Sequence, residues 1–197
     1  MSAPVEGGPV VGDDGKPRCP WGDGPADMRA YHDREWGREV TDDHHLFERI
    51  TLEAFQSGLS WAVVLRKRPR FREVFAEFDP AAVAAYTLAD VARLLDDPGI
   101  IRNRAKIEAT IANARAIEGL DVPLGELLWG YAPAGPSEPP RTVHDVAART
   151  PGSKALAKEL KRRGFAFVGP TTAYALMQAT GMVNDHLAGC HARDRAA

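Results

Sequence analysis

The chain has two cysteines, and each lies near a histidine: Cys19 precedes His32 by thirteen residues, and His186 precedes Cys190 by four. If the second pair is helical, a spacing of four puts both side chains on one face, within reach of one ion. Two thiolates and two imidazoles complete a tetrahedral zinc site with no open position, so such a site would be structural and would join the two ends of the chain. The alternative, a small apolar Cys190 and a satisfied core or cap histidine, is favoured by the spacing alone.

Aromatic residues gather near the first of these pairs. Trp21, Tyr31 and Trp36 lie in one short polar segment, and Trp61 follows further along the chain. Flat rings can sandwich a purine taken out of the DNA duplex, and their electron-rich faces also favour a cationic base. The more common role of such rings is to fill the core. Glu53 interrupts an apolar helical stripe, and helical glutamates usually lie on the surface.

Three short runs are basic: RKRPRFR at 66–72, RNRAK at 102–106 and KELKRR at 158–163. Each could be only a solvated helix face. The last run, which contains Lys161, precedes GFAFVGPTT, where Gly169 permits close backbone approach. The N–H groups of Thr171 and Thr172 then lie at a positive helix N-terminus that suits a phosphate. An ordinary helix-turn-helix packing corner is the alternative, and the basic run shifts the balance toward nucleic acid.

The elements that must position these residues are helices. Apolar residues recur at helical spacing through 46–55, 91–95 and 107–117, and strand patterns are nearly absent. The segment 122–131 predicts a short helix before the loop APAGPSEPPR. Ser153 is expected to cap a helix that stops at Gly164, and a second helix is expected from Gly169 to near Gly181. The pattern predicts an all-α protein.

The composition is that of a globular protein, since 197 residues with 44% hydrophobic content can bury a sizeable core. We expect one two-lobed helical domain over 18–191, between disordered tails at 1–17 and 192–197. The net charge of −2 argues against a surface coated with positive charge but leaves local patches open. With no disulfide framework, signal peptide or membrane-spanning run, we expect a cytoplasmic monomer without membrane contact.

Five motifs occur in one order over roughly residues 18–190: YHDREWG, LEAFQSGLSW, GIIRNRAKI, KRRGFAFVG and VNDH. In this order they resemble 3-methyladenine DNA glycosylase I. The helix pair at about 153–181 resembles the helix-hairpin-helix of the DNA base-excision glycosylase superfamily. The resemblance implies the helix-hairpin-helix DNA glycosylase fold, with its N- and C-terminal segments joined by one structural Zn²⁺ per chain. Its implied ligands are Cys19, His32, His186 and Cys190.

The resemblance also implies a reaction and the residues that perform it. The substrate is double-stranded DNA containing an alkylated purine, and hydrolysis of the N-glycosidic bond releases free 3-methyladenine and leaves an abasic site. Glu53 stands where the family's glutamate hydrogen-bonds the flipped base, inside a pocket formed by Trp21, Tyr31 and Trp61, with Trp36 nearby. The residues implied in DNA contact are Gly58, Leu59, Gly169, Thr171, Thr172 and Lys161. Leu59 is either a wedge that fills the gap left by the base or a core residue.

The mechanism needs little acid catalysis, because the N3-methylated base departs neutral from a cationic nucleotide. Flipping, positioning and electrostatic support of the sugar would be the enzyme's main contributions. Asn184 occupies the position where many superfamily members carry an aspartate, so no catalytic aspartate is assigned. No lysine stands at the hairpin position that forms a Schiff base in some relatives, which predicts a monofunctional glycosylase.

Two readings of other classes stay open at this point. One is a non-catalytic helix-hairpin-helix protein that binds DNA, such as a damage sensor. The other is a zinc-stabilised interaction module without DNA, which the glycine hairpin beside KELKRR disfavours. Glu53 and the aromatic cluster discriminate the enzyme from the sensor, because binding phosphates requires neither.

Overall fold

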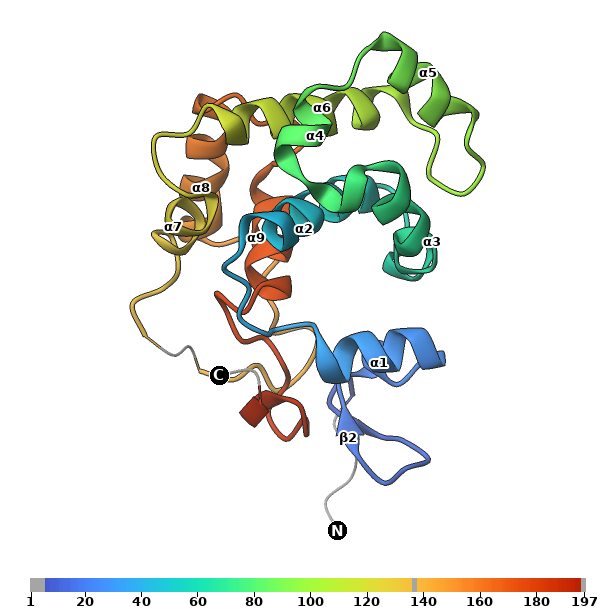
Figure 1. The fold of residues 1–197 in the computed structure, drawn as a ribbon. Helices are drawn as coiled ribbons and strands as arrows, with labels where there is room; N and C mark the ends of the chain where they lie inside the picture. Colours follow the sequence, from blue (N-terminus) through green and yellow to red (C-terminus); the bar gives the residue numbers. More distant parts are fainter. Residues whose placement is uncertain (1–5, 136–137, 196–197) are drawn as a thin grey trace.

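A computed structural model of the chain describes residues 6–135 and 138–195, and in this part the protein is mostly helical, as predicted (Figure 1). Two-residue strands form one antiparallel hairpin, β1 (Val10–Val11) with β2 (Pro17–Arg18). The helices of the first half are α1 (Ala26–Arg34), α2 (Asp43–Gln56), α3 (Trp61–Val74), α4 (Pro80–Ala84) and α5 (Leu88–Asp96). The later ones are α6 (Arg104–Glu118), α7 (Leu124–Trp129), α8 (Pro151–Arg162) and α9 (Pro170–Ala179). Short 3-10 turns occur at Pro20–Gly22, Ala76–Phe78 and Arg193–Arg195.

Helix α2 is the central element of the core. Its residues from Leu46 to Phe55 are all buried, and it contacts α3, α6, α7 and α9. Asp42 begins the helix by accepting a hydrogen bond from the His45 N–H, which satisfies one of the free donors of the first turn. A helix buried on every side must satisfy the polar side chains it carries. Both Glu48 and Glu53 are buried on α2, so each needs a partner or a function.

Glu48 has partners, because Arg68 and Arg72 of α3 both donate to its carboxylate. Burial alone would raise the pKa of Glu48, but these hydrogen bonds outweigh it and lower the pKa to about 2. Arg68 also pairs with Glu35 after α1, so one ionic network joins α1, α2 and α3. The basic run at 66–72 is therefore structural, and its remaining cations pair with Asp27, Asp97 and the Pro98 carbonyl.

The helix pair near the C-terminal end has its N-cap three residues earlier than predicted. Thr150, not Ser153, is the N-cap of α8, and Ser153 completes a capping box by accepting from the Thr150 N–H. The helix ends at Arg162, and Gly164, the residue after its C-cap, has a φ of +93° that is readily adopted only by glycine. Pro170 opens α9, as expected from its missing N–H donor.

The two ends of the chain lie together, apart from the bundle around α2 (Figure 1). The His191 N–H donates to the Pro17 carbonyl, and a small second hydrophobic cluster contains Cys19, Leu187, Cys190 and Ala192. Residues within both predicted tails make defined contacts, since Asp14 pairs with Arg18 and Arg193 donates to the Asn184 carbonyl. The disorder of these tails stays a prediction. The side chain of Arg18 is only 1% exposed and pairs with Asp14 and Asp33, which fixes the N-terminal hairpin. Residues 1–5 and 196–197 of the predicted tails lie outside the described residues.

A short left-handed segment follows α3. Ala76, Glu77 and Phe78 have φ angles of 51°, 52° and 57°, a conformation that L-residues seldom adopt in succession. Phe78 is buried in the main core while Glu77 is exposed, so packing of the phenylalanine stabilises the turn.

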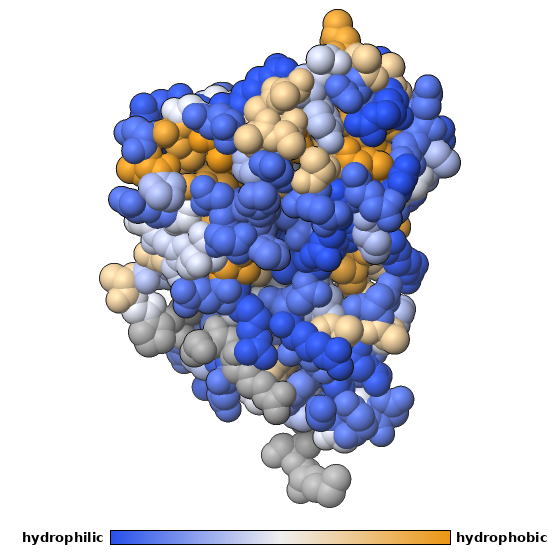
Figure 2. Space-filling view, viewed as in Figure 1, coloured by the Kyte–Doolittle hydropathy of each residue, from blue (hydrophilic) through white to orange (hydrophobic). Residues whose placement is uncertain are grey.

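The surface is mainly polar on the face shown in Figure 2, where apolar groups form separate patches and no continuous belt. Within 6–135 and 138–195, no helix has the length and apolarity needed to cross a membrane.

Candidate active site

A cavity of about 490 Å³ lies between α1, α2, the start of α3 and α9. Its wall contains all five residues predicted to bind a base, which come from three separate parts of the sequence: Trp21, Tyr31, Trp36, Glu53 and Trp61. Such a volume lies within the range of small-molecule sites and accommodates one purine base.

The rings of the cavity pack in two pairs. The centroids of Tyr31 and Trp61 lie 5.0 Å apart with an angle of 42° between their planes, and Trp21 meets Trp36 edge-to-face at 5.0 Å. Tyr31 is fully buried, while the three tryptophans are half-buried and keep surface for the cavity. Contacts between rings hold each ring in place, so the walls are formed before any ligand binds.

Glu53 is the acidic group of α2 that lacks a partner. Its residue is 6% exposed, and in the part of the chain that the structure describes no donor hydrogen-bonds its carboxylate. Burial raises the pKa of Glu53 to about 7, and the charge of Arg49, one helical turn earlier, opposes that rise. A buried carboxylate that faces a cavity and accepts no hydrogen bond from the described residues favours a ligand that brings donors or further positive charge.

The loop between α2 and α3 lies beside this cavity and leads into Ser60 and Trp61 of its wall. Gly58 has a φ of +82°, so the loop requires glycine there. Leu59 is 42% exposed, which excludes the alternative that it is a core residue.

A second group of predicted residues meets where the chain ends come together. The side chains of Cys19, His32, His186 and Cys190 are buried, and their ligand atoms lie within 4.8 Å of one another. Cys190 Sγ is 3.5 Å from His32 Nε2 and 3.6 Å from His186 Nδ1, while Cys19 Sγ is 3.9 Å from the same His186 atom. Two ligands bound to one tetrahedral zinc at usual bond lengths would be about 3.6 Å apart. The donor set therefore fits such an ion.

The remaining nitrogen of each imidazole also has the partner that a metal-bound histidine needs. His32 Nδ1 lies 2.8 Å from a carboxylate oxygen of Asp33, and His186 Nε2 lies 3.1 Å from the Trp36 carbonyl oxygen. These acceptors orient both rings toward the cluster. The segment from His186 to Cys190 is not helical, contrary to the assumption behind the spacing argument. It folds as a turn in which Gly189 has a φ of +84°, and the turn brings Cys190 back toward His186.

The residues predicted to bind phosphates lie around the turn between α8 and α9. Gly169, Thr171 and Lys161 are exposed, and Thr172 is half-buried. A Cβ added to Gly169 would meet no atom within 4 Å, so the space in front of this backbone is open. Unlike Arg162 and Arg163, which pair with Glu159, Lys161 has no ion pair within the described residues.

Comparison with known proteins identifies the family of this chain. A family model described as methyladenine glycosylase matches residues 21–194. The chain is a member of the methyladenine glycosylase family.

Similar proteins cover almost the whole matched region. The DNA-3-methyladenine glycosylase 1 of Escherichia coli (strain K12) is 47% identical over 177 residues, which are 88% of this chain and 95% of that protein. A crystal structure of 3-methyladenine DNA glycosylase I is 46% identical with a TM-score of 0.85, over 88% of this chain and 98% of that one. Another structure, of a variant of 3-methyladenine DNA glycosylase I in complex with 3-methyladenine, is 31% identical with a TM-score of 0.84. It covers 89% of this chain and 97% of that one.

The cavity of this methyladenine glycosylase family member also has walls that the sequence did not reveal. Asp185 and Gln178 line it, as do Val143 and Val146 of the loop before α8. The Tyr174 hydroxyl and the Gln178 amide donate to one Asp185 oxygen at 2.6 and 2.8 Å. The spacing of Gln178 one helical turn after Tyr174 was a signal that these two side chains share a face. Nothing in the sequence of the loop before α8 indicated that its valines line the cavity.

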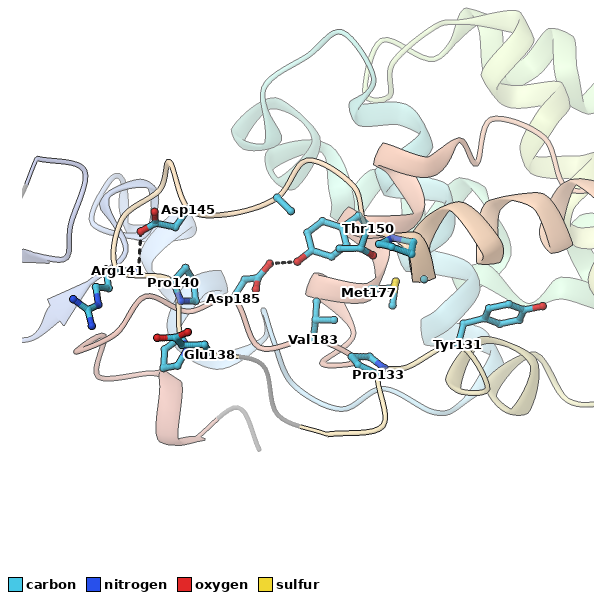
Figure 3. A pocket seen from close by; sticks show the side chains of 15 residues that line it. Tyr131, Pro133, Glu138, Pro140, Arg141, Asp145, Thr150, Met177, Val183 and Asp185 are labelled. Carbon is cyan, nitrogen blue, oxygen red and sulfur yellow. Dashed lines mark hydrogen bonds between the residues drawn. The ribbon is translucent and has the colours of Figure 1, made fainter.

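Asp185 also borders a second cavity, of about 710 Å³, between that loop and α9 (Figure 3). Figure 3 shows the Asp185 carboxylate at the cavity wall beside Val183, where it accepts a hydrogen bond from the Tyr174 hydroxyl. Asn184, its neighbour, lines neither cavity and instead donates to the Arg193 carbonyl.

Proposed function

We propose that this protein hydrolyses the N-glycosidic bond of 3-methyladenine in alkylated double-stranded DNA. The reaction releases free 3-methyladenine and leaves an abasic site. The observation that carries the proposal is Glu53, a buried carboxylate without a partner, in a cavity walled by aromatic rings in a chain of the methyladenine glycosylase family.

Charge explains how this cavity selects its base. A 3-methyladenine attached to deoxyribose is cationic, so it restores the ionised form of Glu53 that burial alone disfavours. The carboxylate accepts from the exocyclic amine while the rings cover both faces of the purine. A normal adenine brings no charge and leaves the carboxylate uncompensated. Once bound, the methylated base departs as a neutral molecule, and water attacks the sugar.

The flipped base needs a replacement in the stack, and we assign this role to Leu59. Its exposed side chain on the glycine-containing loop lies directly before two residues of the cavity wall. Leu59→Ala should weaken binding of lesion-containing DNA. It should leave the thermal stability unchanged, because the exposed leucine side chain contributes little buried surface to the core. Equal losses of binding and stability would refute the wedge.

The hairpin of α8 and α9 supports binding of the DNA backbone, and we assign it to the helix-hairpin-helix class. Its exposed Gly169 and Thr171, with Thr172, offer N–H groups at the start of α9, and the exposed Lys161 adds a cation. We propose one two-lobed domain over 18–191, acting as a cytoplasmic monomer.

We further propose that Cys19, His32, His186 and Cys190 hold one structural zinc ion. Four protein ligands leave no position for substrate, so the ion would join the chain ends without taking part in hydrolysis. Metal analysis should give about one zinc per chain. Absence of zinc, together with a Cys190→Ala variant as stable as wild type, would refute the site.

The decisive experiment measures free 3-methyladenine released from N3-methylated duplex DNA by wild type, Glu53→Gln and Glu39→Gln. Wild type and the Glu39 variant, which changes an exposed glutamate outside the cavity, should release the base, and Glu53→Gln should lose most of the activity. Wild-type binding without release would favour the damage sensor. A protein–DNA adduct trapped by borohydride would contradict the monofunctional mechanism.

A further inference from the structure

A second apolar side chain projects from a loop, as Leu59 does. Phe167, in the turn between α8 and α9, is 45% exposed, although its neighbours Phe165 and Val168 are buried at 5% and 8%. Its φ of +58° lies in the left-handed region. That conformation is a clear outlier for a bulky residue, and glycine would adopt it without strain.

Helix α6 enforces this conformation through Asn113, which is only 1% exposed. The Asn113 amide donates to the Ala166 carbonyl at 3.2 Å, and its oxygen accepts from the Ala166 N–H at 2.7 Å. A buried amide that satisfies both backbone groups fixes the residue next to Phe167. The surrounding structure therefore holds the phenylalanine in a strained backbone with its ring outward.

The same helix holds the loop that carries Leu59. Lys106 of α6 is buried, and its ammonium donates to the carbonyls of Phe55 and Ser57 at 2.9 and 2.7 Å. These hydrogen bonds satisfy carbonyl groups at the C-terminal end of α2, just before Gly58. Lys106 therefore fixes the start of the loop and is not available to bind a phosphate. The basic run at 102–106 thus contains a positioning residue.

The two anchors share one face of α6 because seven residues are about two helical turns. Their separation along the helix axis is about 10.5 Å, or about three base-pair steps of a DNA strand. A rigid helix therefore sets the spacing between the loops of Leu59 and Phe167.

We propose that Phe167 is a second apolar contact with DNA, whose ring packs on a deoxyribose of the duplex that Leu59 enters. The inference rests on the proposed function. Along the chain, Phe167 lies between the exposed Lys161 and the start of α9, whose cation and N–H groups suit the phosphates that flank a sugar. Backbone strain that the fold maintains is found preferentially at functional positions, and an exposed phenylalanine gives the fold little packing in return.

Two variants separate the ring from the strain. Phe167→Ala removes the ring and keeps a strained backbone, whereas Phe167→Gly removes both. The probe is a duplex with a tetrahydrofuran abasic-site analogue. Both variants should bind it about tenfold more weakly, in the range expected for loss of one aromatic contact with nucleic acid. The Tm of the glycine variant should exceed that of the alanine variant by a few degrees, and binding of free 3-methyladenine should equal that of wild type.

Leu88→Ala is the matched control, since Leu88 is an exposed apolar residue of α5 at 81%. It should bind the duplex as wild type does. Binding of both Phe167 variants within twofold of wild type would overturn the contact, as would a loss confined to the glycine variant, which would indicate loop flexibility. If wild type released no 3-methyladenine, the proposed function would fail; if it did and the variants bound normally, only this inference would.

Discussion

Glu53→Gln should stabilise the fold above neutral pH while it abolishes the selection of a cationic base. The pKa of Glu53 rises from its ordinary 4.5 to about 7 because the carboxylate is buried without a donor. Between these values the folded protein holds a proton that the unfolded chain releases, so wild type loses stability as pH rises. At about 1.4 kcal/mol per unit, the loss reaches about 3 kcal/mol above pH 7 and is absent below pH 4.5.

The assay is chemical unfolding of wild type and Glu53→Gln at intervals from pH 4.5 to 8. The glutamine cannot ionise, so the difference in unfolding free energy should move in its favour by about 3 kcal/mol across this range. Any cost of burying the amide is independent of pH and only shifts the whole curve. Glu39→Gln, at an exposed position, should give a flat difference.

A difference for Glu53→Gln that stays constant within about 1 kcal/mol would refute the reasoning, since it would mean that the carboxylate is solvated or already paired. The same variant should bind the abasic duplex normally, because the surfaces that contact the backbone are unchanged. One substitution would then raise the unfolding free energy and weaken base recognition. This is expected where a functional group is held in an unfavourable environment.

Other parts of the structure give three further predictions. Glu48→Gln should lower the unfolding free energy by about 3 kcal/mol at pH 7, because it removes the buried carboxylate that pairs with Arg68 and Arg72 and leaves Arg68 with Glu35 alone. In wild type this contribution should fade as pH falls from 4.5 toward 2. Removal of metal with a chelator should lower the wild-type Tm and leave that of Cys190→Ala unchanged, as followed by calorimetry. Glu77→Gly should raise the unfolding free energy by about 1 kcal/mol, since glycine accepts the positive φ and no buried contact is lost; a lower value in denaturant titration would contradict the strain.

The helices were predictable where their apolar residues face one core. The stripe at 46–55 matches α2, and 107–117 lies within α6, because burial against several neighbours imposes the helical period. The N-terminal hairpin was not predictable in this way. Its order depends on Arg18 reaching Asp33 and on Pro17 meeting His191, which are contacts between distant segments of a polar sequence.

The candidate site was also predictable only in part. The predicted base-binding residues meet in one cavity and the predicted metal ligands meet in one cluster. The valines and Asp185 could not be placed, because the path of the loop before α8 follows from packing and not from a local pattern. The role of the run at 66–72 stayed open in the sequence, and the structure shows that its charges pair with acidic groups that join α1, α2 and α3.

The meeting of the chain ends gives this protein an order of assembly during synthesis. Cys190 lies 158 residues after its neighbour His32, so at ordinary translation speeds the first half of the cluster exists for about 8 to 30 s before the second half is made. Trp21 and Trp36 stand against the imidazoles of that cluster, and therefore take their final places last. A chain that ends before His186 contains every helix around α2 but lacks half of the cluster against which Trp21 and Trp36 pack. In the proposed mechanism, such a chain would have an incomplete cavity for the base.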